Sequence, residues 1–386
     1  MVSPTVTELP RNLEPATPDP FVQDLNELSS PRRRPVPPQP RKGVRMSRKR
    51  LAGAVVAAAA AALITPALAS AQVPAPPCVT NGEAGLAYQA GVNCRTVEVD
   101  GHPRRYIVYV PNRRPTTGAR APVVFMYHGR SGTGDQFLGI SGWREQADAV
   151  GLVAVFPTGV RYRDLESGRV ETGWNPFGFE DEVDLTERPD GYPPAPAPWP
   201  ADDVGFTDAM VADLQARLPI DRRRVYASGF SNGAEFTARL AVERSTVLAA
   251  AAVSGGGLLA RAPQRPIPVY STLGSVDGKI LAYTGPPPLT ELPLDPVALL
   301  SEPTIGSTLD AQVAALGLDE NDFGVTSAPH STSFRWPATG TGPAGALFRF
   351  AVLEGVGHQY PNGRNNPAGF ASAPEFWAFF SAHRLP

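Results

Sequence analysis

The sequence predicts an α/β fold in which a mostly parallel sheet is flanked by helices on both faces. Short, continuous apolar runs are typical of strands that are buried on both faces of such a sheet. In this chain of 386 residues they occupy 123–127, 152–156, 248–253 and 347–353. An amphipathic segment at 143–150 separates the first two runs, and the order strand, helix, strand implies a right-handed crossover. We therefore expect one α/β domain in residues 72–386.

The stretch around Ser231 carries the most specific motif. An apolar strand at 225–228 leads into Gly229-Phe230-Ser231-Asn232-Gly233, and an amphipathic helix is expected to follow. Gly-x-Ser-x-Gly between a strand and a helix is the nucleophile elbow of α/β-hydrolases, a strained turn that presents a serine hydroxyl at the top of the sheet. The glycines are needed because side chains there collide with the neighbouring strand and helix. An ordinary glycine-rich loop is the alternative.

The N-terminal region reads as a leader rather than as part of the domain. Residues 1–45 are rich in proline and charge and are expected to be disordered, either from an upstream start codon or as a long leader. Residues 46–71 have the basic start, short alanine-rich core and small-residue end of a signal peptide. The alternative is an uncleaved anchor, although the core is short for a membrane span. We expect a secreted, extracellular protein with no stable membrane anchor after cleavage.

The number of cysteines and the net charge limit which ligands and partners the protein is expected to have. Cys78 and Cys94 are the two cysteines, and in an exported protein we expect them to form a disulfide. A disulfide that closes a loop of about 15 residues stabilises the folded state by about 3 kcal/mol. No histidine pair lies nearby for structural zinc, and we expect no metal or organic cofactor. The formal net charge of −2, with acids and bases mixed, gives no reason to expect nucleic acid as a partner. We expect a monomer.

A serine nucleophile requires a histidine and a carboxylate, which follow it in the order Asp/Glu, His in this fold. Among the three histidines after Ser231, His358 lies in a glycine-rich loop directly after a strand, whereas His330 lies in a polar loop and His383 in the terminal helix. Asp277 follows the strand expected at 267–273. We predict Asp277 and His358 as partners of the serine. The alternatives are a structural loop histidine and a turn aspartate that caps its own backbone.

Acyl transfer also needs backbone donors for the developing oxyanion. We expect one from the amide of Asn232, directly after the nucleophile. The other is expected from the loop after the strand at 123–127, first from Arg130 and second from Ser131. His128 precedes the elbow and is expected to support this loop through hydrogen bonds.

Residues 160–201 interrupt the alternation of strands and helices with many prolines and several aromatic residues. A segment of this length without regular structure, inside a domain, is usually functional or disordered. We expect an inserted loop that partly covers the active site; a solvated insertion without a role is the alternative.

Taken in order, five motifs resemble the secreted polyhydroxybutyrate depolymerase and feruloyl esterase family of α/β-hydrolases, over nearly all of residues 100–385. They are 122–134 with His-Gly-x-x-Gly-Thr, 203–206, 221–234, 274–277 and 357–361. The resemblance implies an esterase whose triad is Ser231, Asp277 and His358. It also implies that Trp174 and Asn175 lie near the substrate cleft, where we expect Tyr360 as well.

The resemblance implies an ester substrate, either a hydroxyacid oligomer or polymer or a feruloylated polysaccharide. We predict a hydroxyalkanoate esterase, with a feruloyl or acetylxylan-type cell-wall esterase as the alternative. The chain departs from the family at Arg130-Ser131, where small residues or cysteine are usual, and in its longer 161–200 segment. A non-catalytic binding protein and a peptidase or lipase are the rivals. Against a lipase, the sequence has no long apolar lid.

Overall fold

The structure is a computed structural model that describes residues 87–112, 119–186, 199–259 and 261–386. The predicted extension 1–45, the signal peptide 46–71 and Cys78 lie outside these residues and stay predictions. Cys94 is buried in the first strand and is not a free thiol, but its expected partner is not among the described residues. None of the helices in the described ranges is long and apolar enough to cross a membrane.

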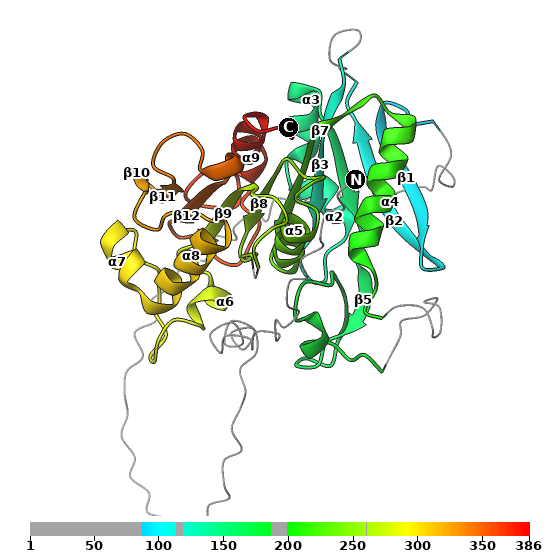
Figure 1. Ribbon diagram of the computed structural model, residues 1–386. Helices are drawn as coiled ribbons and strands as arrows, with labels where there is room; N and C mark the ends of the chain where they lie inside the picture. Colours follow the sequence, from blue (N-terminus) through cyan, green and yellow to red (C-terminus); the bar gives the residue numbers. More distant parts are fainter. Residues whose placement is uncertain (1–86, 113–118, 187–198, 260) are drawn as a thin grey trace, which may run out of the picture.

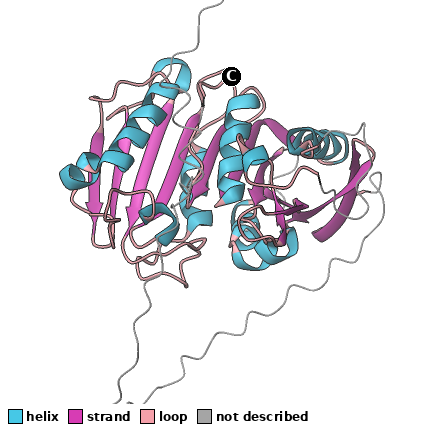
Figure 2. Ribbon diagram, turned by 90° about the horizontal axis from the view of Figure 1, so that it is seen from below, coloured by secondary structure: helices cyan, strands magenta, loops and turns pink. Residues whose placement is uncertain are grey.

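A ten-stranded sheet runs through the molecule in the order β1-β2-β4-β3-β7-β8-β9-β12-β11-β10. From β4 to β12 neighbouring strands are parallel, and antiparallel strands flank them at both edges. Figure 1 shows the sheet spread from β1 and β2 to β10 and β11, and Figure 2 shows its twist. The strands are β1(Gly91–Val99), β2(His102–Val110), β3(Ala121–Tyr127), β4(Val153–Pro157), β7(Ile220–Phe230), β8(Ala250–Ser254), β9(Pro268–Gly274), β10(Gly324–Ala328), β11(Ser331–Trp336) and β12(Leu347–Leu353).

Helices cover both faces of this sheet, so two apolar cores form. Along β3, Phe125 and Tyr127 face one core while Val124 and Met126 face the other, because successive side chains of a strand point to opposite faces. The first core is closed by α4(Asp203–Arg217), α5(Asn232–Glu243) and α8(Pro303–Ala315). The second is closed by α2(Gly134–Ile140), α3(Trp143–Val150) and α9(Ser372–Ser381). This is the predicted α/β-hydrolase fold.

The inserted segment is more regular than its sequence indicated. It contains an antiparallel hairpin, β5(Val160–Arg163) and β6(Val170–Gly173), and the 3-10 turn η1(Phe179–Asp181). The prediction of an irregular loop is therefore wrong for this part, and residues 187–198 lie outside the described ranges. Buried Tyr162 and Phe179 meet edge to face at 4.6 Å between ring centroids and give the hairpin a small core of its own. The short helices α6(Gly278–Leu281) and α7(Pro296–Ser301) and the turn η2(Pro343–Gly345) complete the elements.

Candidate active site

The turn between β7 and α5 has the geometry of a nucleophile elbow. Ser231 has φ 51° and ψ −126°, a left-handed conformation that non-glycine residues rarely adopt. A Cβ on Gly229 would lie 2.1 Å from the Gly233 carbonyl oxygen, and one on Gly233 would lie 2.3 Å from that of His128. Both glycines are therefore required by close backbone contacts, and the turn holds the Ser231 side chain at the carboxyl end of the parallel strands.

Ser231, His358 and Asp277 form a continuous hydrogen-bonded chain. The Ser231 Oγ lies 2.8 Å from His358 Nε2, and His358 Nδ1 lies 2.8 Å from Asp277 Oδ2. Because a carboxylate only accepts, Nδ1 carries the proton and Nε2 is free to accept the serine proton. The Asp277 side chain is 1% exposed, whereas that of His358 is 22% exposed. Asp277 Oδ1 also accepts the Lys279 amide at 3.0 Å, so the capping role considered as an alternative is present together with the histidine contact.

The loops that carry Asp277 and His358 are joined to each other before their side chains meet. Ser275 N donates to Leu353 O at 2.8 Å and Val276 N to Val356 O at 3.1 Å. A Cβ on Gly274 would lie 2.0 Å from Val356 O, so this close approach requires glycine. The separation of the acid and the base is thus set by backbone contacts.

Two backbone amides lie close to the Ser231 turn: Asn232 follows Ser231 directly, and a Cβ on Gly129, the residue before Arg130, would lie 3.3 Å from Ser231 Cβ. Neither the Arg130 amide nor the Asn232 amide donates a hydrogen bond to any of the described residues. The Ser131 amide, our second choice, donates to Thr172 O at 2.8 Å and is therefore occupied. Arg130 follows β3 and Asn232 opens α5, so the two amides come from separate elements, as an oxyanion hole of this fold requires.

His128 supports the Arg130 loop from below, as its position in the sequence predicted. Its buried ring accepts the Gly159 amide at Nε2 (3.0 Å) and therefore donates from Nδ1 to the Gly129 carbonyl (2.7 Å). Burial, with a smaller contribution from the nearby Arg104 charge, lowers the pKa of His128 to about 4. The imidazole is therefore neutral at pH 7 and its proton stays on Nδ1.

The inserted segment holds both amide-bearing elements. Trp174 Nε1 donates to His128 O at 2.9 Å, and the Trp174 amide donates to Asn232 Oδ1 at 2.7 Å. Asn232 Nδ2 returns a bond to Trp174 O at 3.1 Å. On the other side, the Arg130 guanidinium pairs with Asp164 and Glu182 of the same segment. One segment therefore contacts the two elements that supply the amides.

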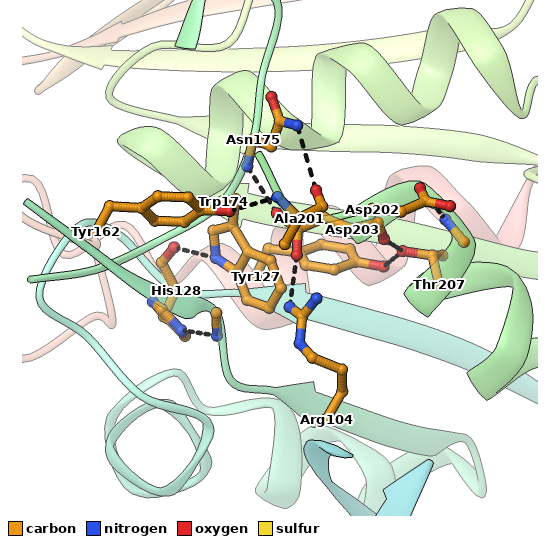
Figure 3. Close-up of polar contacts among 12 residues, drawn as sticks. Arg104, Tyr127, His128, Tyr162, Trp174, Asn175, Ala201, Asp202, Asp203 and Thr207 are labelled. Carbon is orange, nitrogen blue, oxygen red and sulfur yellow. Dashed lines mark hydrogen bonds and ion pairs between the residues drawn. The ribbon is translucent and has the colours of Figure 1, made fainter. Parts of the chain in front are cut away.

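A second group of contacts anchors this segment to the sheet. Buried Asp203 accepts the Asn175 amide at 2.7 Å and pairs with Arg104 at 2.5 Å, while Asn175 Nδ2 donates to Ala201 O at 3.2 Å. Figure 3 shows Trp174 and Asn175 between His128 on one side and Ala201 and Asp203 on the other. These groups connect β2, α4 and the inserted segment.

The three residues expected near the substrate cleft, Trp174, Asn175 and Tyr360, make packing and hydrogen-bond contacts inside the protein. Trp174 is 0% exposed and Tyr360 is 4% exposed, so both side chains are packed inside the protein, and their expected place near a substrate cleft stays a prediction. Tyr360 packs against Phe230, whose ring in turn lies 5.1 Å from that of His358. The Asn175 side chain is directed to Ala201 and belongs to the anchor. All three residues support the elements around Ser231, a role that the sequence did not indicate.

The other two later histidines lie away from the serine. Exposed His330 joins the turn between β10 and β11 and pairs with Glu354 at 2.7 Å. His383 follows α9 and packs against Phe379. Within the described ranges, no group of three or more histidine, cysteine, aspartate or glutamate side chains is arranged to hold a metal ion.

Three known proteins resemble this chain at low sequence identity. No family model matches. NocK of Nocardia uniformis subsp. tsuyamanensis, a candidate esterase, is 28% identical over 287 residues, which cover 71% of this chain and 75% of NocK. The solved acetyl xylan esterase from Aspergillus awamori is 16% identical with a TM-score of 0.46, over 75% of this chain and 99% of that one. An S-formylglutathione hydrolase from Agrobacterium tumefaciens is 14% identical with a TM-score of 0.44, over 76% and 95% of the two chains. Because the identities to these solved structures and their TM-scores are low, the fold is assigned from the strand order of this chain.

Proposed function

We propose that this protein is a secreted serine esterase that hydrolyses carboxylic esters through an acyl-enzyme. The observation that carries the proposal is the Ser231–His358–Asp277 chain with both contacts at 2.8 Å, near two amides that donate to none of the described residues. Acyl transfer needs an attacking group, a base, a carboxylate that orients the base, and donors for the oxyanion. The similarity to NocK, a candidate esterase, supports the same class of reaction.

In the proposed mechanism, Ser231 Oγ attacks the ester carbonyl carbon while His358 Nε2 accepts the serine proton. Asp277 stabilises the imidazolium, and the Arg130 and Asn232 amides bind the oxyanion. The alcohol leaves with the proton from His358, which gives the acyl-enzyme. Water then attacks this intermediate with His358 again as base, which releases the acid and restores the Ser231 hydroxyl.

For the substrate, the motif resemblance supports a hydroxyalkanoate oligomer or polyester as the first class to assay. Its feruloyl and acetylxylan relatives make cell-wall esters the second. Export is supported by the leader pattern of residues 46–71. N-terminal sequencing of the exported product tests this part, because a product that retains residues 51–64 would contradict secretion through a cleaved signal.

The direct test compares the wild type with Ser231→Ala on p-nitrophenyl acetate, a 3-hydroxybutyrate oligomer and methyl ferulate. We expect loss of activity on the order of 10⁶-fold, as for other serine triads, with an unchanged unfolding transition. A fluorophosphonate probe should label the wild type at Ser231 and leave the variant unlabelled. Near-normal activity of Ser231→Ala would refute the mechanism. Failure of both labelling and hydrolysis in the wild type would favour the non-catalytic binding protein.

A further inference from the structure

An apolar cavity of about 160 Å³ lies beneath the loop that follows β8. Its walls come from β9, β12, α6 and α8, with Leu258, Ile280, Ile305, Leu309 and Phe350 as the main apolar groups. Figure 1 shows α8 and α6 next to β9 and β8, on the side of the sheet that α5 covers. None of the residues proposed for the triad or the oxyanion hole lines this cavity.

Three consecutive glycines lie between the cavity and the backbone of the Ser231 turn. Gly255, Gly256 and Gly257 have φ of 67°, 136° and 82°, conformations that favour glycine. A Cβ on Gly255 would lie 3.6 Å from His358 Cε1, and one on Gly256, which lines the cavity, would lie 3.9 Å from the Ser231 carbonyl oxygen. This loop therefore places no side chain between the cavity and the Ser231 turn.

The size of the cavity limits what it can accept. Pockets that enclose whole drug-sized molecules measure about 300–1,000 Å³, so this one fits a substituent and not an entire substrate. An apolar cavity of about 150 Å³ in another protein accommodates benzene. A group of about six carbon atoms is therefore the upper size expected here.

The lining of the cavity disfavours charged groups. Glu235 Oε1, one turn after Ser231, lies 4.0 Å from the position of a Cβ on Gly256, and burial together with the neighbouring Glu182 raises the pKa of this carboxyl. A substituent that carries its own carboxylate would lose its hydration against the apolar wall and would find no charged partner among the lining residues. Hydroxyls interrupt the otherwise apolar wall at Ser271, Tyr283, Thr304 and Thr308.

We propose that this cavity is a subsite for one compact, uncharged apolar substituent of the ester, which selects substrates by the size of that group. The inference rests on the proposed esterase function. A hydroxybutyryl unit is within the permitted size, whereas a feruloyl group, a substituted ring with a propenoyl arm, exceeds it. The cavity thus favours the hydroxyalkanoate class.

The test measures kcat/KM over two ester series. One series lengthens the acyl group of p-nitrophenyl esters from acetate to decanoate, and the other lengthens the alcohol of alkyl acetates. Each buried CH₂ contributes about fourfold, so we expect a rise on the order of 100-fold from two to six carbons in one series and a fall beyond it. The series that shows the optimum identifies whether the acyl or the alcohol group enters. An analogue of optimal length that ends in a carboxylate should be cleaved at least tenfold more slowly.

Two variants change the volume in opposite directions. Thr308→Phe fills the cavity and should reduce the discrimination between six and two carbons to below tenfold, while it retains hydrolysis of p-nitrophenyl acetate. Leu258→Ala enlarges the cavity and should shift the optimum to longer chains. Thr326→Phe is the matched control, since Thr326 is exposed on β10 at the sheet edge and should leave the profile unchanged.

The outcomes separate the subsite from the esterase function. Ser231-dependent hydrolysis with a length profile that neither cavity variant alters would overturn the subsite and leave the esterase intact. Absence of Ser231-dependent hydrolysis in the wild type on every ester would refute the proposed function, and the subsite with it. An optimum that moves shorter in Thr308→Phe and longer in Leu258→Ala would establish the subsite.

Discussion

Neutral, buried His128 makes the stability of the protein depend on pH. In the unfolded chain an imidazole binds a proton below about pH 6.5, whereas burial lowers the pKa of folded His128 to about 4. Between these values the unfolded state binds the additional proton. The stability is therefore complete above pH 6.5 and is lost as the pH falls toward 4.

The size of this effect follows from the two pKa values. Each pH unit between them costs about 1.4 kcal/mol, so the loss is about 2 kcal/mol at pH 5 and about 3 kcal/mol at pH 4. Typical domains have a free energy of unfolding of about 5–15 kcal/mol, so this loss from a single histidine is a large share of the total stability. Protonation also breaks the hydrogen bond that His128 Nε2 accepts from the Gly159 amide at 3.0 Å, because two N–H groups would then face each other.

Urea unfolding of the wild type and His128→Gln at pH 7.5 and pH 5.0 tests this reasoning. Glutamine does not titrate, so the stability advantage of the wild type over the variant should shrink by about 2 kcal/mol at the lower pH. Carboxylates that titrate in both proteins cancel in the difference. His330→Gln, which removes an exposed imidazole, is the control. An advantage of equal size at both pH values would refute the assignment of a neutral, buried His128.

Three further substitutions examine the geometry of the site. Trp174→Phe keeps an aromatic ring, although a smaller one, and leaves the His128 carbonyl without the indole donor, which should cost about 1–3 kcal/mol of stability in urea unfolding and lower kcat more than it raises KM. Arg130→Met keeps the backbone amide but removes both ion pairs, so kcat should fall about tenfold with little change in KM; a change confined to KM would contradict a positioning role. Gly229→Ala places a methyl 2.1 Å from the Gly233 carbonyl and should prevent folding or lower the unfolding temperature by more than 10 °C; a normal transition would contradict the elbow geometry.

The parallel strands could be predicted because burial on both faces leaves a continuous apolar run, as in β12 and β4. Strand β1 was missed because Asn93 and Arg95, which are 1% and 2% exposed, interrupt its apolar pattern. Helices α7 and α8 were also missed, although each begins with a capping acid followed by proline, Asp295-Pro296 and Glu302-Pro303. That start signal was present in the sequence, but no strong apolar periodicity follows it.

The members of the hydrogen-bonded chain could be predicted because each follows a strand in a glycine-bearing turn, which is a local signal. The supporting groups could not. Trp174 and Asn232 are 58 positions apart, and Arg130 and Glu182 are 52 apart. Their pairing depends on how the inserted segment folds back over the sheet edge, and no periodicity within either stretch encodes that path.

In the proposed mechanism the inserted segment is therefore part of the reacting geometry, through the buried side chain of Trp174. Stabilisation of an oxyanion requires two donors at about 2.7–3.1 Å from one oxygen, and the two amides proposed for this role belong to elements that follow different strands. Trp174 binds the side chain of Asn232 on one element and the His128 carbonyl on the other. A displacement of Trp174 would change the distance between the two amides without altering either loop alone. Substitutions that loosen the segment should accordingly lower kcat for every ester in proportion, whereas substitutions in the cavity beneath Gly256 should change which ester is preferred.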